Sequence, residues 1–130
     1  MLKVHTLNDQ ICPHMNNAAH GVEIPPGARL LFTNGQVGAR KDGTVPGDVA
    51  EQFDVIFERL GHVLAASGMG FADVVKLTVY VTDKRHFDAF QRVRARCMKD
   101  NNPAATMLVV GPFVRAGVEA EVEVIAAKVG

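Results

Sequence analysis

The sequence predicts an α+β fold in which two helices cover one face of a mixed β-sheet. Apolar residues recur at helical spacing from Phe53 to Leu64 and from Phe87 to Cys97. Apolar and polar residues alternate from Val75 to Val81 and from Val118 to Val124, as in half-buried strands. The order of these elements is strands, helix, strand, helix and two strands, which favours helices gathered on one side of the sheet.

The N-terminal third of the chain predicts short strands joined by turns. Residues 3–7 and 20–24 each have the pattern of a strand, and residues 25–27 (Pro-Pro-Gly) form a turn. The run RLLFT at 29–33 is apolar on both faces, and such strands are usually covered on both sides. Residues 35–46 contain three glycines and a proline and predict a loop.

Capping residues set the limits of both helices. Asp48 is a good N-cap for the first helix, and Glu51 stands three residues later, as in a capping box. Gly68 ends this helix. Thr82 or Asp83 caps the second helix, which the sequence Asn101-Asn102-Pro103 ends.

Length and composition limit the class of protein. We expect 130 residues, of which 48% are apolar and 22% charged, to form a single domain spanning 1–130. The net charge is zero and the basic residues are scattered, so no nucleic-acid partner is expected. No apolar run reaches the ~20 residues that span a bilayer, and the N-terminus lacks the apolar core of a signal peptide. We therefore expect a cytoplasmic protein without a membrane partner.

The two cysteines suggest neither a disulfide nor a metal site. Two thiols in a cytoplasmic chain are expected to be reduced. Cys97 lies at helical spacing from Phe87 and Phe90, which predicts buried packing. Cys12 and His14 form one pair of potential ligands without a second pair, so no metal is expected, and no cofactor either.

One face of the predicted sheet has no helix to cover it. The last strands, at residues 105–110 and 118–124, complete the sheet and carry apolar residues on this face too. Association with further copies of the chain is the simplest cover.

Four segments resemble the Rid family (RidA/YjgF/UK114-like imine/enamine deaminases). They are TNGQVG at 33–38, GMGFADVVKLTVYVTD at 68–83, NPAATMLVV at 102–110 and VEAEVEVIA at 118–126. The resemblance extends over roughly residues 20–128. It implies a chorismate-mutase-like fold and a homotrimer whose sheets line a central barrel. It also implies a cleft between subunits that takes a small-molecule ligand.

The resemblance assigns roles to particular residues. Imine-hydrolysing members use an arginine and a turn amide to hold the substrate carboxylate, a tyrosine to line the cleft, and a glutamate to position water. Gly35 matches the turn glycine, and Glu121 matches the catalytic glutamate. Ala105 stands at the arginine position and Thr106 follows it. Ala18 stands roughly where the tyrosine would be.

Other polar residues are candidates for binding. Gln91 matches a helix position that often points toward the cleft. Arg115, after Pro112, and the pair Arg40 and Lys41, after the Gly35 turn, are cations that could replace the arginine. A lost charge-assisted carboxylate contact costs on the order of 1.5–3 kcal/mol, which corresponds to a ~10- to 100-fold slower reaction.

Each assignment has a structural alternative. Glu121 lies between Glu119 and Glu123, so the three could form a solvated acidic face. Gly35 could serve only to allow a positive φ in a tight turn. Gln91 and Thr106 suit an ordinary helix surface and an ordinary strand, and His20 is a lone histidine, which is more often structural.

The sequence supports two main functions. The first is hydrolytic deamination of a reactive enamine, imine or related small metabolite, with an atypical substrate because Ala105 replaces the arginine. The second is a non-catalytic Rid homologue that binds a small ligand or regulates. A third, ribonuclease activity, has little support from the charge balance.

Overall fold

The computed structural model describes residues 2–14 and 18–130 and confirms the α+β class with a mixed sheet. The main sheet has the order β3-β7-β5-β6, and β4 also pairs with β7. Its strands are β3 (Arg29–Phe32), β4 (Gln36–Val37), β5 (Val74–Val81), β6 (Ala104–Val109) and β7 (Ala120–Lys128). Strands β5 and β6 are parallel, whereas every pairing of β7 is antiparallel.

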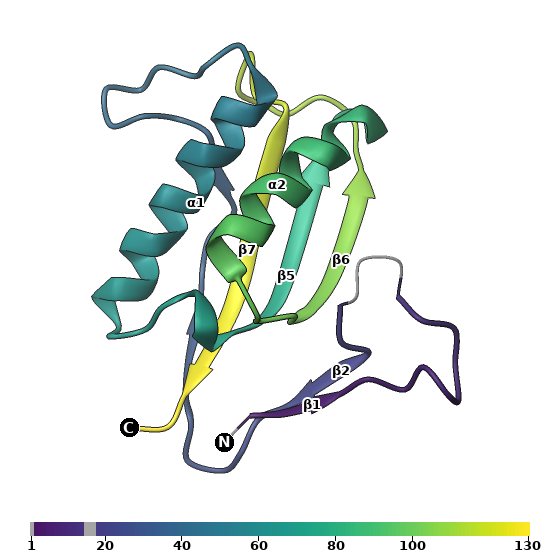
Figure 1. The fold of residues 1–130 in the computed structure, drawn as a ribbon. Helices are drawn as coiled ribbons and strands as arrows, with labels where there is room; N and C mark the ends of the chain where they lie inside the picture. Colours follow the sequence, from purple (N-terminus) through teal and green to yellow (C-terminus); the bar gives the residue numbers. More distant parts are fainter. Residues whose placement is uncertain (1, 15–17) are drawn as a thin grey trace.

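Both helices cover the same face of this sheet (Figure 1). Helix α1 spans Val49–Ala66, and the Asp48 side chain caps it by accepting from the Ala50 N–H at 3.1 Å. The carboxylate of Glu51 lies 3.3 Å from Arg40. Helix α2 spans Phe87–Met98 and follows a 3₁₀ turn at Lys84–His86 that Asp83 caps.

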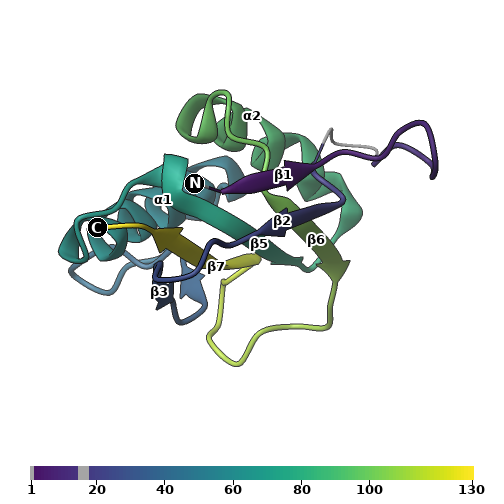
Figure 2. The same ribbon diagram turned by 90° about the horizontal axis from the view of Figure 1, so that it is seen from below.

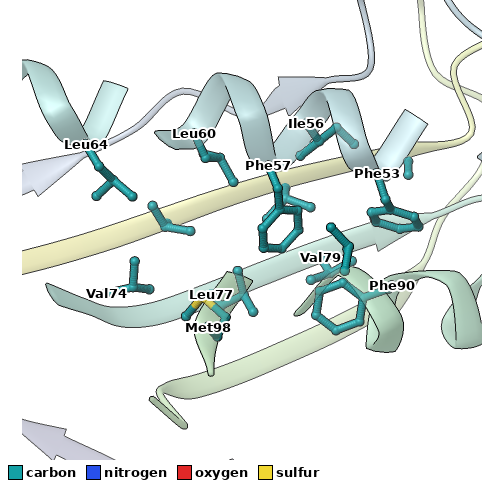
Figure 3. Close-up of a cluster of buried hydrophobic side chains, with 14 of the residues drawn as sticks. Phe53, Ile56, Phe57, Leu60, Leu64, Val74, Leu77, Val79, Phe90 and Met98 are labelled. Carbon is teal, nitrogen blue, oxygen red and sulfur yellow. The ribbon is translucent and has the colours of Figure 1, made fainter. Parts of the chain in front are cut away.

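The core lies between the helices and the sheet (Figure 3). Phe53 on α1 and Phe90 on α2 have ring centroids 5.7 Å apart, and both rings are buried. Leu77 and Val79 of β5 belong to the same buried cluster. Cys97 is half-buried and packs against this core, which agrees with its predicted packing role.

The face of the sheet away from the helices is open in the single chain. Alternation places Leu30, Phe32 and Leu108 on this face, and all three are exposed, Phe32 at 66%. Tyr80 and Glu123 lie on the same face. The predicted uncovered face with apolar residues is therefore present.

The first two strands form a separate ladder. Strand β1 (Lys3–His5) pairs antiparallel with β2 (Gly21–Glu23) rather than with the main sheet. Figures 1 and 2 place this ladder beyond the end of the sheet at which β5 and β6 begin.

One buried polar side chain joins α1 to two loops. Gln52 is fully buried, and its Nε2 donates to the carbonyls of Pro46 and Gly117, each at 2.9 Å. Its Oε1 accepts from the backbone N–H of Glu119 at 2.9 Å. Gln52 thus joins the loop that precedes α1 to the loop that precedes β7.

We predict that Gln52→Leu lowers the free energy of unfolding by about 2–4 kcal/mol, since each buried backbone group left without a partner costs ~1–3 kcal/mol. Urea unfolding followed by circular dichroism at one fixed protein concentration measures the change. Gln10→Leu, at an exposed position, is the matched control. A loss below about 0.5 kcal/mol for Gln52→Leu would contradict this role.

Candidate functional site

Glu121 lies on the open face of the sheet, directly across from Tyr80 on the neighbouring strand. It is half-buried, whereas its strand neighbours Ala120 and Val122 are completely buried toward the helices. Burial, and to a smaller extent the negative charge of Glu123, raises the pKa of the Glu121 carboxyl above its ordinary value.

The three glutamates of this segment are not equivalent. Glu123 accepts a hydrogen bond from the Tyr80 hydroxyl at 2.8 Å, and the carboxylate of Glu119 lies 3.4 Å from Nε2 of His86. Glu121 has no hydrogen-bond or ion-pair partner among the residues that the structure describes. A uniform solvated acidic face does not describe this arrangement, because Glu121 alone of the three has a carboxylate without a partner among the described residues.

Gly35 lies against the Glu121 side chain. It comes just before β4, whose residues Gln36 and Val37 pair with Val122 and Glu121. A Cβ atom at position 35 would overlap the Glu121 carboxylate. The alternative explanation of Gly35, a positive φ, is wrong, because Gly35 is not among the residues with positive φ. The absence of a side chain at position 35 lets the Glu121 carboxylate approach the backbone here, and a Cβ would displace it.

A cavity of about 390 Å³ lies next to Glu121, between β5, β7 and the loop after β6. The residues that line it are Tyr80, Val110, Gly111, Pro112, Phe113, Val114, Glu121 and Glu123. Sequence reasoning missed Tyr80, although the alternation of β5 places it on the same face as Glu121.

The three candidate replacement cations lie elsewhere in this chain. Arg115 donates to the carbonyl of Gly43, and Arg40 pairs with Glu51 on α1. Lys41 lines a groove beside α1. None of the three is among the residues that line the cavity next to Glu121.

Ala105 lies on the opposite, helix-covered side of the sheet at its β6 edge. It packs against the core together with Met107, two residues further along the strand. A cavity of about 520 Å³ follows Ala105 along this edge. Its lining comprises Val81, Phe87, Met107 and Val109, with His14, Lys84 and Asp88 as its polar members.

This β6-edge cavity contains a cation that sequence reasoning missed. Lys84 belongs to the turn before α2, and Asp88 stands one helical turn after it, so the lining holds both charges. Gln91 follows Phe87 by one turn of α2 and is half-buried. The period-two spacing of Ala105, Met107 and Val109 places these three side chains on one face of β6, and it could have predicted this apolar lining from the sequence.

Thr106 faces the open side of the sheet, unlike Ala105. Its hydroxyl accepts a hydrogen bond from Nζ of Lys76 at 2.7 Å. Lys76 and Thr106 stand on the parallel neighbours β5 and β6, and this pairing could not be read from the order of residues alone.

One chain does not bring all these residues together. Gly35 and Glu121 lie at β4 and β7, whereas Ala105 and Thr106 lie on β6, beyond β5. Adjacent strands are ~4.8 Å apart, so about 10 Å of sheet separates β7 from β6 and about 15 Å separates Gly35 from β6. Ala105 faces the helices whereas Glu121 faces the open side, and the cavities next to them share no lining residue.

Ala18 and Ala19 lie beside the start of β6. Ala18 is buried, and the N–H of Ala19 donates to the carbonyl of Asn102. His20 accepts from the Leu7 N–H at Nδ1 and lies 2.9 Å from the Cys12 carbonyl at Nε2. These bonds support the structural alternative for His20.

Comparison with known proteins gives consistent matches. The family model "Endoribonuclease L-PSP" matches residues 19–128. The mitochondrial protein mmf2 of Schizosaccharomyces pombe is 33% identical over 76% of this chain and 80% of its own length. The 2-iminobutanoate/2-iminopropanoate deaminase of Rattus norvegicus is 32% identical over 75% of this chain and 72% of its own length.

A solved structure shares the fold. The Rid-family protein YyfB from Yersinia pestis superposes with a TM-score of 0.85 at 23% identity and covers 98% of both chains. Among residues 2–14 and 18–130, no helix has the length and apolar character needed to cross a bilayer. The relative from S. pombe is named mitochondrial, so similarity alone does not assign a compartment. By the extent of the family match and the identity to these relatives, the chain belongs to the Rid/YjgF family.

Proposed function

We propose that this protein hydrolyses a reactive imine or enamine that lacks an α-carboxylate, and releases ammonia. The observation that carries the proposal is the half-buried carboxylate of Glu121, which touches Gly35 and has no partner among the described residues. Its two neighbouring glutamates are engaged by Tyr80 and His86. A relative named as an imine deaminase supports the reaction class.

The chemistry needs one base and one water molecule. Glu121 accepts a proton from water as the oxygen attacks the carbon of the protonated imine, which gives a neutral carbinolamine. The protonated Glu121 then returns that proton to the carbinolamine nitrogen. The C–N bond breaks as Glu121 takes the proton of the hydroxyl group, so ammonia leaves and a carbonyl forms. Ammonia carries away this last proton, and the protonated imine and water are converted to carbonyl compound and ammonium. The backbone of Gly35 and the side chains of Thr106 and Gln91 bind the polar parts of the substrate.

The proposal places this reaction in a cleft between subunits of a homotrimer whose open sheet faces line a central barrel. Two observations support that assembly. Phe32 and Leu108 are apolar and exposed on the open face, which a second copy would cover. Glu121 and Ala105 face opposite sides of the sheet in one chain, so a cleft that holds both needs the edge of another chain. We expect this assembly to work in the cytoplasm.

The missing arginine restricts the substrate. The β6-edge cavity beside Ala105 is lined mainly by apolar side chains, and its cation Lys84 has Asp88 close by in the lining. A substrate carboxylate there would meet repulsion from Asp88 as well as attraction to Lys84. The same apolar lining favours the alternative function, binding of a small ligand without turnover.

We predict that Glu121→Gln slows imine hydrolysis by about 10²- to 10⁴-fold, because the variant cannot accept the proton of water. An amine oxidase generates the imine from a primary amine, and semicarbazide traps what survives. Glu23→Gln, on the exposed ladder strand β2, is the charge-matched control. Equal rates for wild type and Glu121→Gln would exclude this mechanism. Saturable binding of the imine's amine analogue without any turnover would instead establish the alternative.

We predict that Ala105→Arg accelerates hydrolysis of 2-iminopropanoate, generated from alanine by an amino-acid oxidase, by about 10- to 100-fold. The new guanidinium would bind the carboxylate. Ala104→Arg adds the same charge to the opposite face of β6 and should give no gain. If both variants gain equally, or neither gains, Ala105 does not mark the position that selects substrates.

We predict that activity falls toward acid with an apparent pKa above 4.5, the ordinary glutamate value, because burial and Glu123 both disfavour the Glu121 carboxylate. Only the deprotonated form accepts a proton, so the raised pKa moves the acid limb to higher pH. Glu123→Gln removes the repulsion and should move the limb to lower pH, still above 4.5, since burial is the larger cause. A pH profile of kcat/KM that does not move in this variant would refute the assignment of the limb to Glu121.

A further inference from the structure

A third concave surface lies on the outer side of α1, between that helix and the loop that follows β4. It is a groove of about 500 Å³. Its lining consists of Ala39, Arg40, Lys41, Val55, Glu58, Arg59 and His62. None of these residues lines the cavity next to Glu121 or the β6-edge cavity, so the groove is separate from the proposed reaction site.

The charge of this groove differs from that of the chain as a whole. The chain has 14 basic and 14 acidic residues. The groove lining has three permanent cations, Arg40, Lys41 and Arg59, against one carboxylate, Glu58. Glu51 pairs with Arg40 from outside the lining, but both side chains are about half exposed, so this pair neutralises Arg40 only weakly. The lining therefore attracts anions.

Arg59 is fixed before any ligand arrives. Its Nε donates to Oε1 of Gln36 at 3.0 Å, and its Nη1 donates to the carbonyl of Ala39 at 2.7 Å. The loop carrying Ala39 is itself held against α1, because Gly38 lies so close to Gln52 that a Cβ there would be 2.7 Å from the Gln52 backbone. A guanidinium ordered in advance loses little freedom on binding.

Binding capacity remains unused at Arg59 and Lys41. Nη2 of Arg59 makes no hydrogen bond with any described residue, and Lys41 has neither a hydrogen bond nor an ion pair within residues 2–14 and 18–130. His62 lies 4.0 Å from Glu58 and adds a further cation when protonated. Guanidinium and ammonium donors that converge on one groove suit the several oxygens of a phosphate group. Ala39 and Val55 give the groove an apolar part that can contact the organic portion of a phosphate ester.

We propose that this groove, formed by Arg40, Lys41, Arg59 and His62, binds the phosphate group of a small phosphate monoester. The site is independent of the imine chemistry and does not require a second subunit. Through its bond to Gln36, Arg59 also connects the groove to the residue that follows Gly35.

Isothermal titration calorimetry on the full chain tests the site with three probes: ribose 5-phosphate, inorganic phosphate and ribose. We expect saturable binding of ribose 5-phosphate below millimolar concentration and none of ribose. Binding should weaken about tenfold or more in Arg59→Gln and in Lys41→Gln, since each loses a charge-assisted contact. Arg92→Gln removes an exposed positive charge on α2, outside the groove, and should leave binding unchanged.

Lys41 is exposed and makes no hydrogen bond or ion pair with the described residues, so Lys41→Gln should fold normally. This variant therefore tests the site even if Arg59→Gln fails to fold. Inorganic phosphate binding as tightly as ribose 5-phosphate would overturn the preference for an ester. Absence of saturable binding, or equal weakening in Arg92→Gln, would overturn the site itself, since only the overall charge would then attract the probe.

Discussion

The structure depends most on strand β7, because β3, β4 and β5 all pair with it. Its alternation sends Val122 and Val124 into the core and leaves Glu121 and Glu123 on the open face. A slip of one residue would bury the carboxylates and expose the valines, so hydrophobic burial fixes the register. The same burial that stabilises the fold therefore decides where the Glu121 carboxylate points.

Cross-strand contacts then distinguish the acidic residues from one another. Tyr80 donates a hydrogen bond to Glu123 and His86 lies beside Glu119. Gly35 leaves room for Glu121, which has no partner within residues 2–14 and 18–130. Ala105 and its apolar cavity lie at the β6 edge, on the helix-covered side of the sheet. The Rid-type reaction that we propose for this protein therefore uses a surface shared between copies.

Sequence patterns were sufficient for both helices, for the longer strands and for the face that carries Glu121, but β4 lies within residues 35–46, which were predicted as a loop. Helical spacing predicted α1 and α2, and period-two alternation placed Glu121 on the face away from the core. The same patterns could not show that Glu121 differs from Glu123, because the Tyr80–Glu123 bond depends on the register between β5 and β7. The glycine at position 35 is explained by the close approach of Glu121 on β7, not by a positive φ. Such a contact between distant segments leaves no signal in the local sequence.

We propose an assembly because Glu121 and Ala105 face opposite sides of the sheet in one chain, and a second chain would bring both to one ligand. Native mass spectrometry of the purified protein tests it directly and needs no substrate. We predict a dominant species of three 14.0 kDa chains at micromolar concentration. A species of one chain at every concentration would contradict it, and would leave the Glu121 carboxylate without the surface that completes its site.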